Sequence, residues 1–230
     1  MNSRRRRLPW LEPGADPDAF PPADEALDEP PGLLAAGGDL SVDRLLAAYR
    51  RGIFPWYSPG QPILWWCPDP REVLFPQQFH RSRSLTRRER RGDFEIRMDQ
   101  AFAEVVGACA APRARERGTW ITPEMQAAYE QLHERGYAHS IEVWRDERLV
   151  GGVYGVRLGA VFFGESMFSR EPDGSKLALS ALATRSESLG LQLIDCQMPS
   201  PHLASLGSRT LPREEFLALL ARWIPIDLRR

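Results

Sequence analysis

The sequence predicts an α+β fold around one largely antiparallel sheet, and three observations lead to that prediction. Beyond Arg71 the residue patterns run in the order strand, helix, three-strand meander, helix, strand and helix. A chain of 230 residues is long enough for one large domain or two small ones. Its 43% hydrophobic, 10% aromatic and 27% charged residues are typical of a folded globular protein.

Residues 1–71 are predicted to form a small N-terminal domain that begins with an extended lead-in over residues 1–28. The lead-in is rich in proline and acidic residues, a composition that favours irregular backbone. Asp39 and Ser41 can then cap a short helix that ends at Gly52. Prolines and aromatic residues crowd the rest of this domain, so we expect neither a normal helix nor a normal strand there.

Residues 72–230 are predicted to form a second domain, because the regular patterns lie there. Pro123 suits the first position of a helix, and Gly136 suits its end. A polar turn at 145–148 separates the first two strands of the meander. The expected strands are 72–75, 94–98, 140–144, 149–157, 160–163 and 192–197. The expected helices are 100–111, 122–136, 176–189 and 212–223.

The charge is balanced overall and uneven locally. Thirty basic and 31 acidic residues leave a formal net charge of -1, which excludes a protein that coats nucleic acid with its whole surface. Between Arg81 and Arg97, however, arginines outnumber acidic residues, so this stretch is either a solvated face or a surface that tracks phosphates. No apolar run approaches the about 18 residues of a membrane span, so we expect no membrane contact.

The sequence suggests no metal and no export signal. Its three cysteines lie far apart without a C-x-x-C pair, so neither a disulfide framework nor a cysteine zinc site is expected. The four histidines are too scattered to form a metal site. The arginines at 4–7 are followed by prolines and acids instead of an apolar segment, so they fail as a secretory signal. We therefore expect a cytoplasmic protein.

Three polar side chains stand inside strongly apolar strand patterns. Glu165 lies among large apolar residues, where lost hydration raises a carboxyl pKa or demands a partner. Asp195 and Gln197 are two residues apart in a buried type of strand, so they are expected on one face. A carboxylate and an amide so placed could orient and deprotonate a nucleophile, or could merely satisfy buried donors. Spacing alone does not decide between these interpretations.

Aromatic residues near arginines form a second candidate site. Exposed aromatic rings stack unpaired bases, each with about 1 to 3 kcal/mol. The same residues could equally belong to the core. The set comprises Tyr49, Trp56, Tyr57, Trp65, Trp66, Trp120 and Tyr129.

Eight ordered segments resemble those of a known enzyme family. They are residues 29–41 (EPPGLLAAGGDLS), 49–56 (YRRGIFPW), 65–71 (WWCPDPR), 118–122 (GTWIT), 139–144 (HSIEVW), 151–156 (GGVYGV), 164–169 (GESMFS) and 193–197 (LIDCQ). Together they resemble the bacterial leucyl/phenylalanyl-tRNA-protein transferase family. Eight motifs in order are far more specific than any one of them.

This resemblance implies a small N-terminal α/β domain followed by an acetyltransferase-like (GNAT) domain. It also implies an enzyme that moves leucine or phenylalanine, and less well methionine, from charged tRNA to the N-terminal Arg or Lys of a protein, marking that protein for degradation. An aminoacyl ester is already activated, so no cofactor is expected. A monomer is expected.

The resemblance also implies roles for individual residues. The positions that match the proposed catalytic pair are Asp195 and Gln197, and Glu165 matches a residue that helps hold the ester end. The matching substrate-binding positions are Tyr49 and Trp56 near the terminal adenosine, with Trp120, Tyr129, Phe162 and Ile194 around the site. The arginines then serve as clamps on the tRNA acceptor end, namely Arg81, Arg83, Arg87, Arg88, Arg90 and Arg91. Lys176, the only lysine, is either a further tRNA contact or a capping or surface residue.

Two other functions fit part of the sequence. An acetyl-CoA-dependent N-acetyltransferase would share the implied fold, but the glycine-rich pyrophosphate loop that it needs before a helix is missing. A non-catalytic RNA-binding module would use the arginines and aromatics but would leave Glu165, Asp195 and Gln197 without a function. The sequence leaves open the ranking of the donors, the natural acceptor proteins, and whether Asp195 removes a proton or only orients the reactants.

Overall fold

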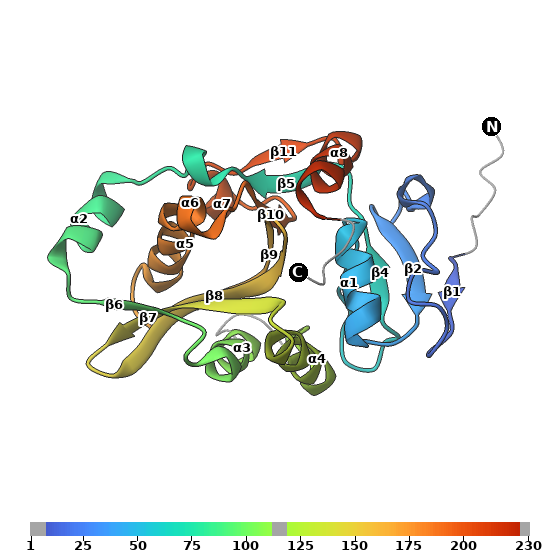
Figure 1. Cartoon of the computed structure of the whole chain (residues 1–230), viewed down its shortest axis with the longest axis horizontal. Helices are drawn as coiled ribbons and strands as arrows, with labels where there is room; N and C mark the ends of the chain where they lie inside the picture. Colours follow the sequence, from blue (N-terminus) through green and yellow to red (C-terminus); the bar gives the residue numbers. More distant parts are fainter. Residues whose placement is uncertain (1–7, 112–118, 226–230) are drawn as a thin grey trace.

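The computed structural model describes residues 8–111 and 119–225, which form two β-sheets with helices packed against them (Figure 1). The smaller sheet has the order β1 (Trp10–Leu11), β2 (Leu33–Gly37), β4 (Leu64–Trp66), β3 (Phe54–Pro55). The larger sheet has the order β11 (Arg209–Leu211), β5 (Arg71–Leu74), β10 (Leu193–Gln197), β9 (Val161–Ser169), β8 (Arg148–Leu158), β7 (Ala138–Arg145), β6 (Glu95–Met98). The α-helices are α1 (Val42–Arg50), α2 (Arg83–Arg91), α3 (Phe102–Ala110), α4 (Pro123–Glu134), α5 (Gly174–Thr184), α6 (Ser186–Leu189), α7 (Pro201–Ala204) and α8 (Arg213–Trp223).

The predicted α+β class and the largely antiparallel sheet are confirmed. Within the described residues, β9 and β10 form the only parallel pair of the larger sheet. The meander forms because its turns have the required residues. Asp146 and Glu147, at φ 47° and 57°, make the two-residue turn between β7 and β8, and Gly159, at φ 56°, turns β8 into β9. The predicted cap of α4 is also present, since Thr122 Oγ1 accepts a hydrogen bond from the backbone N–H of Met125.

Each face of the larger sheet is covered by helices and has its own hydrophobic cluster. One cluster lies under α5 and includes Phe162 and Ile194. The other lies towards α3 and α4 and includes Val161 and Phe163, the neighbours of Phe162 along β9. Alternation along the strand therefore sends adjacent side chains into different clusters.

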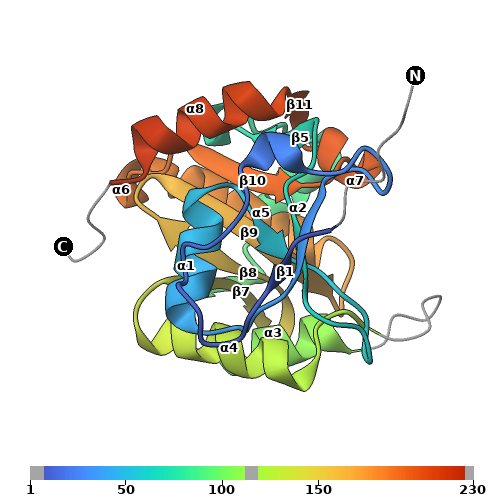
Figure 2. The ribbon, with the colours of Figure 1, turned by 90° about the vertical axis from the view of Figure 1, so that its right-hand side faces the viewer.

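The N-terminal elements pack against the end of the second cluster. Figure 2 shows them in front of the larger sheet, with α8 above and α4 below. Trp65 from β4 and Val73 from β5 belong to the same continuous cluster. The two sheets thus share one core, in which Tyr49, Trp65 and Tyr129 are fully buried.

Several elements differ from their predicted bounds because their partners are distant in sequence. The segment after Gly52 contains the short strands β3 and β4, which pair with each other, and β4 also pairs with β2. The strand expected at 160–163 continues to Ser169 because it pairs with β8 along its whole length. The helix expected at 176–189 divides at Arg185 into α5 and α6. Ser41 is the N-cap residue of α1, but its side chain makes no cap hydrogen bond.

No helix among residues 8–111 and 119–225 is both long enough and apolar enough to cross a lipid bilayer.

Candidate active site

Glu165 lies at a β-bulge where the two sheets meet. The ladder between β8 and β9 pairs Gly155 with Gly164 and Tyr154 with Ser166, so Glu165 is the extra residue of the bulge. Bulges re-aim side chains and are over-represented beside active sites. Glu165 is only 7% exposed, and three side chains from other elements surround its carboxyl group.

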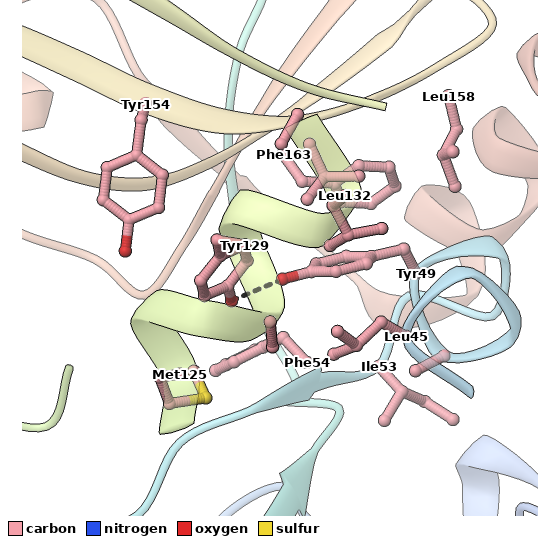
Figure 3. Packing of buried hydrophobic residues seen from close by; sticks show 14 of the residues in the cluster. Leu45, Tyr49, Ile53, Phe54, Met125, Tyr129, Leu132, Tyr154, Leu158 and Phe163 are labelled. Atoms are coloured by element: carbon pink, nitrogen blue, oxygen red, sulfur yellow. Dashed lines mark hydrogen bonds between the residues drawn. The ribbon is translucent and has the colours of Figure 1, made fainter. Parts of the chain in front are cut away.

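These three side chains all donate hydrogen bonds to Glu165. The hydroxyl of Tyr49, on α1, lies 2.8 Å from Oε1, and the hydroxyl of Tyr129, on α4, lies 2.5 Å from Oε2. The amide Nε2 of Gln197, at the end of β10, lies 3.0 Å from Oε1. Figure 3 shows the two tyrosines with their hydroxyl groups facing each other, 2.8 Å apart. The fold therefore brings Tyr49, Tyr129, Glu165 and Gln197 into direct contact, as the resemblance implies for one site.

The pKa of Glu165 is raised from 4.5 to about 7, chiefly because burial disfavours the charged carboxylate. The hydrogen bonds from Tyr129 and Tyr49 oppose this effect. In turn, burial and the nearby Glu165 carboxylate raise the pKa of both phenols well above the usual value of 10, so both tyrosines stay protonated donors. A carboxyl group that exchanges its proton near neutral pH is suited to general acid or base chemistry.

Asp195 is held by an arginine that the sequence interpretation did not single out. Arg71 donates from Nε to Oδ1 over 2.8 Å and from Nη2 to Oδ2 over 2.6 Å, and both side chains are fully buried. Burial alone would lower the pKa of the Arg71 guanidinium, but the Asp195 carboxylate raises it above its usual value. Arg71 closes the 65–71 motif, so its place in the motif was a signal, but its partner is 124 residues away.

The remaining predicted substrate-binding residues occupy two separate places. Trp56 is 45% exposed and leans against Trp66, with 5.8 Å between the ring centroids. Trp120 is half-buried and packs against the second cluster. Phe162 and Ile194 are cross-strand neighbours in the first cluster, under α5. The apolar side chains of the predicted site therefore lie on both faces of the larger sheet.

The predicted tRNA-contact arginines lie on α2 and just before it. Arg81, Arg83, Arg87, Arg90 and Arg91 are exposed, and Arg81 pairs with Glu89 over 3.6 Å. Arg88 is half-buried and pairs with Asp93 over 2.8 Å and with Glu171 over 3.8 Å. Lys176 pairs with Asp173 over 2.9 Å at the start of α5. The arginines at 113, 115 and 117 lie outside the described residues.

A large groove runs along the junction between the N-terminal elements and α4. Its volume is about 1010 Å³, and its lining includes Trp10, Leu40, Tyr57, Ile63, Glu124 and Gln131. Across the described ranges, no group of three or more His, Cys, Asp or Glu side chains is arranged to hold a metal ion. The prediction that the protein needs no metal or cofactor stays a prediction.

Comparison with known proteins identifies the family. Residues 73–221 match the family described as leucyl/phenylalanyl-tRNA protein transferase, and residues 38–69 match the N-terminal domain of the same family. The chain is 58% identical over 214 residues to the leucyl/phenylalanyl-tRNA–protein transferase of Stutzerimonas stutzeri, covering 93% of this chain and 94% of that one. It is 59% identical over 216 residues to that of Azoarcus sp., covering 94% of this chain and 91% of that one.

Solved acetyltransferases are much less similar. A ribosomal-protein-alanine N-acetyltransferase from Brucella melitensis biovar Abortus superposes with a TM-score of 0.35 and 17% identity, over 49% of this chain and 84% of that one. A score this low carries no weight for fold or function, so the fold class rests on the sheet topology above. The acetyl-CoA-dependent acetyltransferase and the non-catalytic RNA-binding module are not favoured by the sequence matches. This chain belongs to the leucyl/phenylalanyl-tRNA protein transferase family, and it is an aminoacyltransferase.

Proposed function

We propose that this aminoacyltransferase moves leucine or phenylalanine, and less well methionine, from aminoacyl-tRNA to the N-terminal Arg or Lys of acceptor proteins. The new peptide bond would mark the acceptor for degradation. The observation that carries the proposal is the buried Glu165 carboxyl group, contacted by Tyr49, Tyr129 and Gln197 where the two sheets meet. This group can exchange a proton near neutral pH, which the reaction requires.

The proposed reaction is the aminolysis of an ester. The neutral α-amine of the acceptor attacks the carbonyl carbon of the aminoacyl ester, the C–N bond forms, and the C–O bond to the terminal ribose breaks. The amine nitrogen gives up one proton, and the ribose oxygen takes one as it leaves. The ionised Glu165 carboxylate receives the amine proton, while Gln197, which is half-buried beside it, orients the reacting groups.

The aromatic residues Trp56 and Tyr49 have different roles at the tRNA end. Trp56 is 45% exposed, which leaves its ring available for stacking on the terminal adenosine. Trp120 lies just before the start of α4. Tyr49 is fully buried, and its hydroxyl is engaged by Glu165. We therefore assign Tyr49 to the support of Glu165 instead of adenosine stacking.

Selectivity for the amino acid is assigned to the apolar cluster under α5. Phe162 and Ile194 are neighbours there, on two strands in the interior of the larger sheet. An apolar pocket distinguishes side chains that differ by one methylene by roughly 1 to 3 kcal/mol. Donor preference is therefore expected to be graded among leucine, phenylalanine and methionine.

The proposal also covers organisation and partners. The exposed arginines of α2 hold the tRNA acceptor end through its phosphates, and Lys176 adds to them when it is released from Asp173. Residues 1–71 form a small domain and residues 72–230 the catalytic one, a division supported by the two separate sheets. The protein acts as a cytoplasmic monomer without a cofactor.

The test is a transfer assay with leucyl-tRNA, acetyl-CoA and a peptide that begins with Arg. We expect leucine at the peptide N-terminus and no acetylation, and acetylation or no product would overturn the assignment. A peptide identical except for an N-terminal Asp is the acceptor control and should stay unmodified. Glu165→Gln should lower the single-turnover rate of leucyl transfer by more than tenfold with little change in tRNA affinity. An unaltered rate would show that Glu165 takes no part in the chemical step.

A further inference from the structure

Arg71 lies beside the proposed catalytic residues, and its hydrogen bonds go to Asp195. Its guanidinium bonds both oxygens of Asp195, and Oδ1 of Asp195 also accepts the backbone N–H of Gln197 over 3.0 Å. Gln197 then donates from its side chain to Glu165. We propose that Arg71 is a positioning residue of the transferase site, which acts through Asp195 to fix the amide of Gln197 against Glu165. This inference rests on the proposed function.

The contacts of Asp195 assign it to support and not to proton removal. Both of its oxygens accept charge-assisted hydrogen bonds from one guanidinium, and neither side chain of the pair is exposed. If Asp195 took a proton from an amine, it would lose its charge and leave Arg71 as an unpaired cation in the core, which is strongly unfavourable. The Arg71–Asp195 ion pair is therefore a fixed element of the site, and another group must accept the proton of the amine.

The surroundings of Arg71 explain why a planar guanidinium is needed. The rings of Phe54, from β3, and Phe216, from α8, lie 4.8 and 4.7 Å from its central carbon. A flat, delocalised cation can stack between two rings while its edge forms a two-pronged contact with a carboxylate. A lysine ammonium has neither the plane nor the fixed fork, so it cannot hold Asp195 in the same orientation.

The fixed orientation of Asp195 acts on the backbone conformation of Gln197. Gln197 has φ 63°, in the left-handed region, and the ladder to β5 shifts register between Asp195 and Gln197. A non-glycine residue in this conformation is strained unless its surroundings hold it, and such strain concentrates at functional sites. The hydrogen bond from the Gln197 N–H to Asp195 is the contact that holds it. Without this contact, β10 could end regularly and Gln197 would leave Glu165.

Stability alone is a weak explanation for this ion pair. A buried ion pair is often no more stabilising than apolar residues of the same volume. Arg71 also has one buried nitrogen, Nη1, without a hydrogen-bond partner among the described residues, which reduces the net benefit further. The position of the pair beside the strained Gln197 is therefore better explained by the geometry that it imposes.

The test uses the full-length enzyme and compares Arg71→Lys, Asp195→Asn and the double variant. We expect Arg71→Lys to lower kcat for leucyl transfer by roughly 10- to 100-fold, as a misplacement near 1 Å does, with KM for leucyl-tRNA within about threefold of the parent. Because the two residues act as a unit, the double variant should be no slower than the slower single variant. The acid limb of the kcat–pH profile should keep its position in Arg71→Lys, which preserves both charges, and should move to lower pH in Asp195→Asn, because the Asp195 carboxylate raises the pKa of Glu165.

A matched control separates positioning from general stability. Arg44 is equally buried, with 1% exposure, and lies 3.4 Å from Asp39 while it bonds the carbonyls of Glu12 and Ala15. Arg44→Lys should lower Tm but leave kcat of the folded enzyme unchanged. A parental kcat in folded Arg71→Lys, losses that multiply in the double variant, or a shifted acid limb in Arg71→Lys would each overturn the proposal.

If Arg71→Lys does not fold, the variant with both Arg71→Met and Asp195→Leu replaces the pair by apolar side chains of similar size. We expect it to fold and to retain less than a tenth of the parental kcat, whereas a parental kcat would overturn the proposal. Leucyl transfer by the parent enzyme is measured in the same experiment. Failure of the parent would count against the proposed function, whereas failure of the Arg71 effect alone would count against the positioning role.

Discussion

Tyr49 and Tyr129 are 80 residues apart in the sequence, and their hydroxyl oxygens are 2.8 Å apart in the fold. Each hydroxyl also contacts one oxygen of Glu165, so three oxygen-to-oxygen contacts close a ring. Two phenols supply only two protons to these three contacts. When Glu165 is ionised, both protons go to its carboxylate oxygens, and these two bonds lower the pKa of Glu165 against the larger effect of burial, which raises it to about 7.

Removal of one phenol hydroxyl should shift the titration of Glu165. Tyr129→Phe deletes a donor that lowers the pKa of Glu165, so this pKa should rise above about 7 and the acid limb of the kcat–pH profile should move to higher pH. Loss of a hydrogen bond to a buried carboxylate should also destabilise the fold by about 1 to 3 kcal/mol. Tyr57→Phe is the control, because its hydroxyl lies 3.3 Å from Thr122 and not at Glu165. An acid limb that does not move would contradict this prediction.

The free energy of unfolding should depend on pH through Glu165. The folded pKa is about 7 and the usual value is 4.5, so between these values the folded protein holds a proton that the unfolded chain has released. This stabilisation is complete below about pH 4.5 and is lost as pH rises through about 7, with a total on the order of 3 kcal/mol.

Glu165→Gln should therefore remove this part of the pH dependence. Urea unfolding at about pH 5 and about pH 8 measures it, and the fall in stability between them should be smaller in the variant than in the parent. Glu130→Gln removes one exposed charge from α4 and controls for the change in net charge. Equal pH dependence in Glu165→Gln and the parent would show that Glu165 does not titrate in this range.

Loss of the exposed Trp56 ring should weaken the use of charged tRNA. Trp56→Ala removes a stacking surface worth about 1 to 3 kcal/mol, so KM for leucyl-tRNA should rise by roughly 5- to 150-fold with kcat little changed. Trp10→Ala is the matched control, since Trp10 is 58% exposed and lies on the rim of the separate groove. Steady-state kinetics with varied leucyl-tRNA measures KM for both variants. Equal KM values would show that Trp56 serves in packing and not in tRNA binding.

Binding of tRNA should weaken with salt, and α2 should set part of the slope. Replacing the exposed Arg83 or Arg91 by Ala should reduce the slope of log K against log salt by about one for each phosphate that is no longer neutralised. Arg88→Ala should change the slope less, because Asp93 and Glu171 already neutralise Arg88. Filter binding of tRNA across a salt series measures these slopes. Identical slopes in the parent and in the Arg83 and Arg91 variants would show that these arginines of α2 contact solvent and not tRNA phosphates.

The local pattern was enough to predict many of the regular elements beyond Arg71 and the family. The meander, the Thr122 cap of α4, the terminal helix and the α+β class all follow from periods of about two and 3.6 residues and from turn residues. Apolar neighbours alone marked Glu165 as a buried carboxyl group in need of partners, and the structure supplies them. The ordered motifs identified the family because eight segments in order are very rarely shared by chance.

Only the tertiary structure decided which side chains meet. Arg71 and Asp195 are 124 residues apart, and Tyr49 and Glu165 are 116 apart, so no local period connects them. The same limit hid strands β3 and β4, which form by pairing with each other and, for β4, with the distant strand β2. The bulge at Glu165 and the left-handed Gln197 break the alternation from which faces are predicted. The residue pattern of one segment reflects which of its side chains are exposed and which are buried. A site depends instead on contacts between distant segments, and these contacts form only when the chain folds.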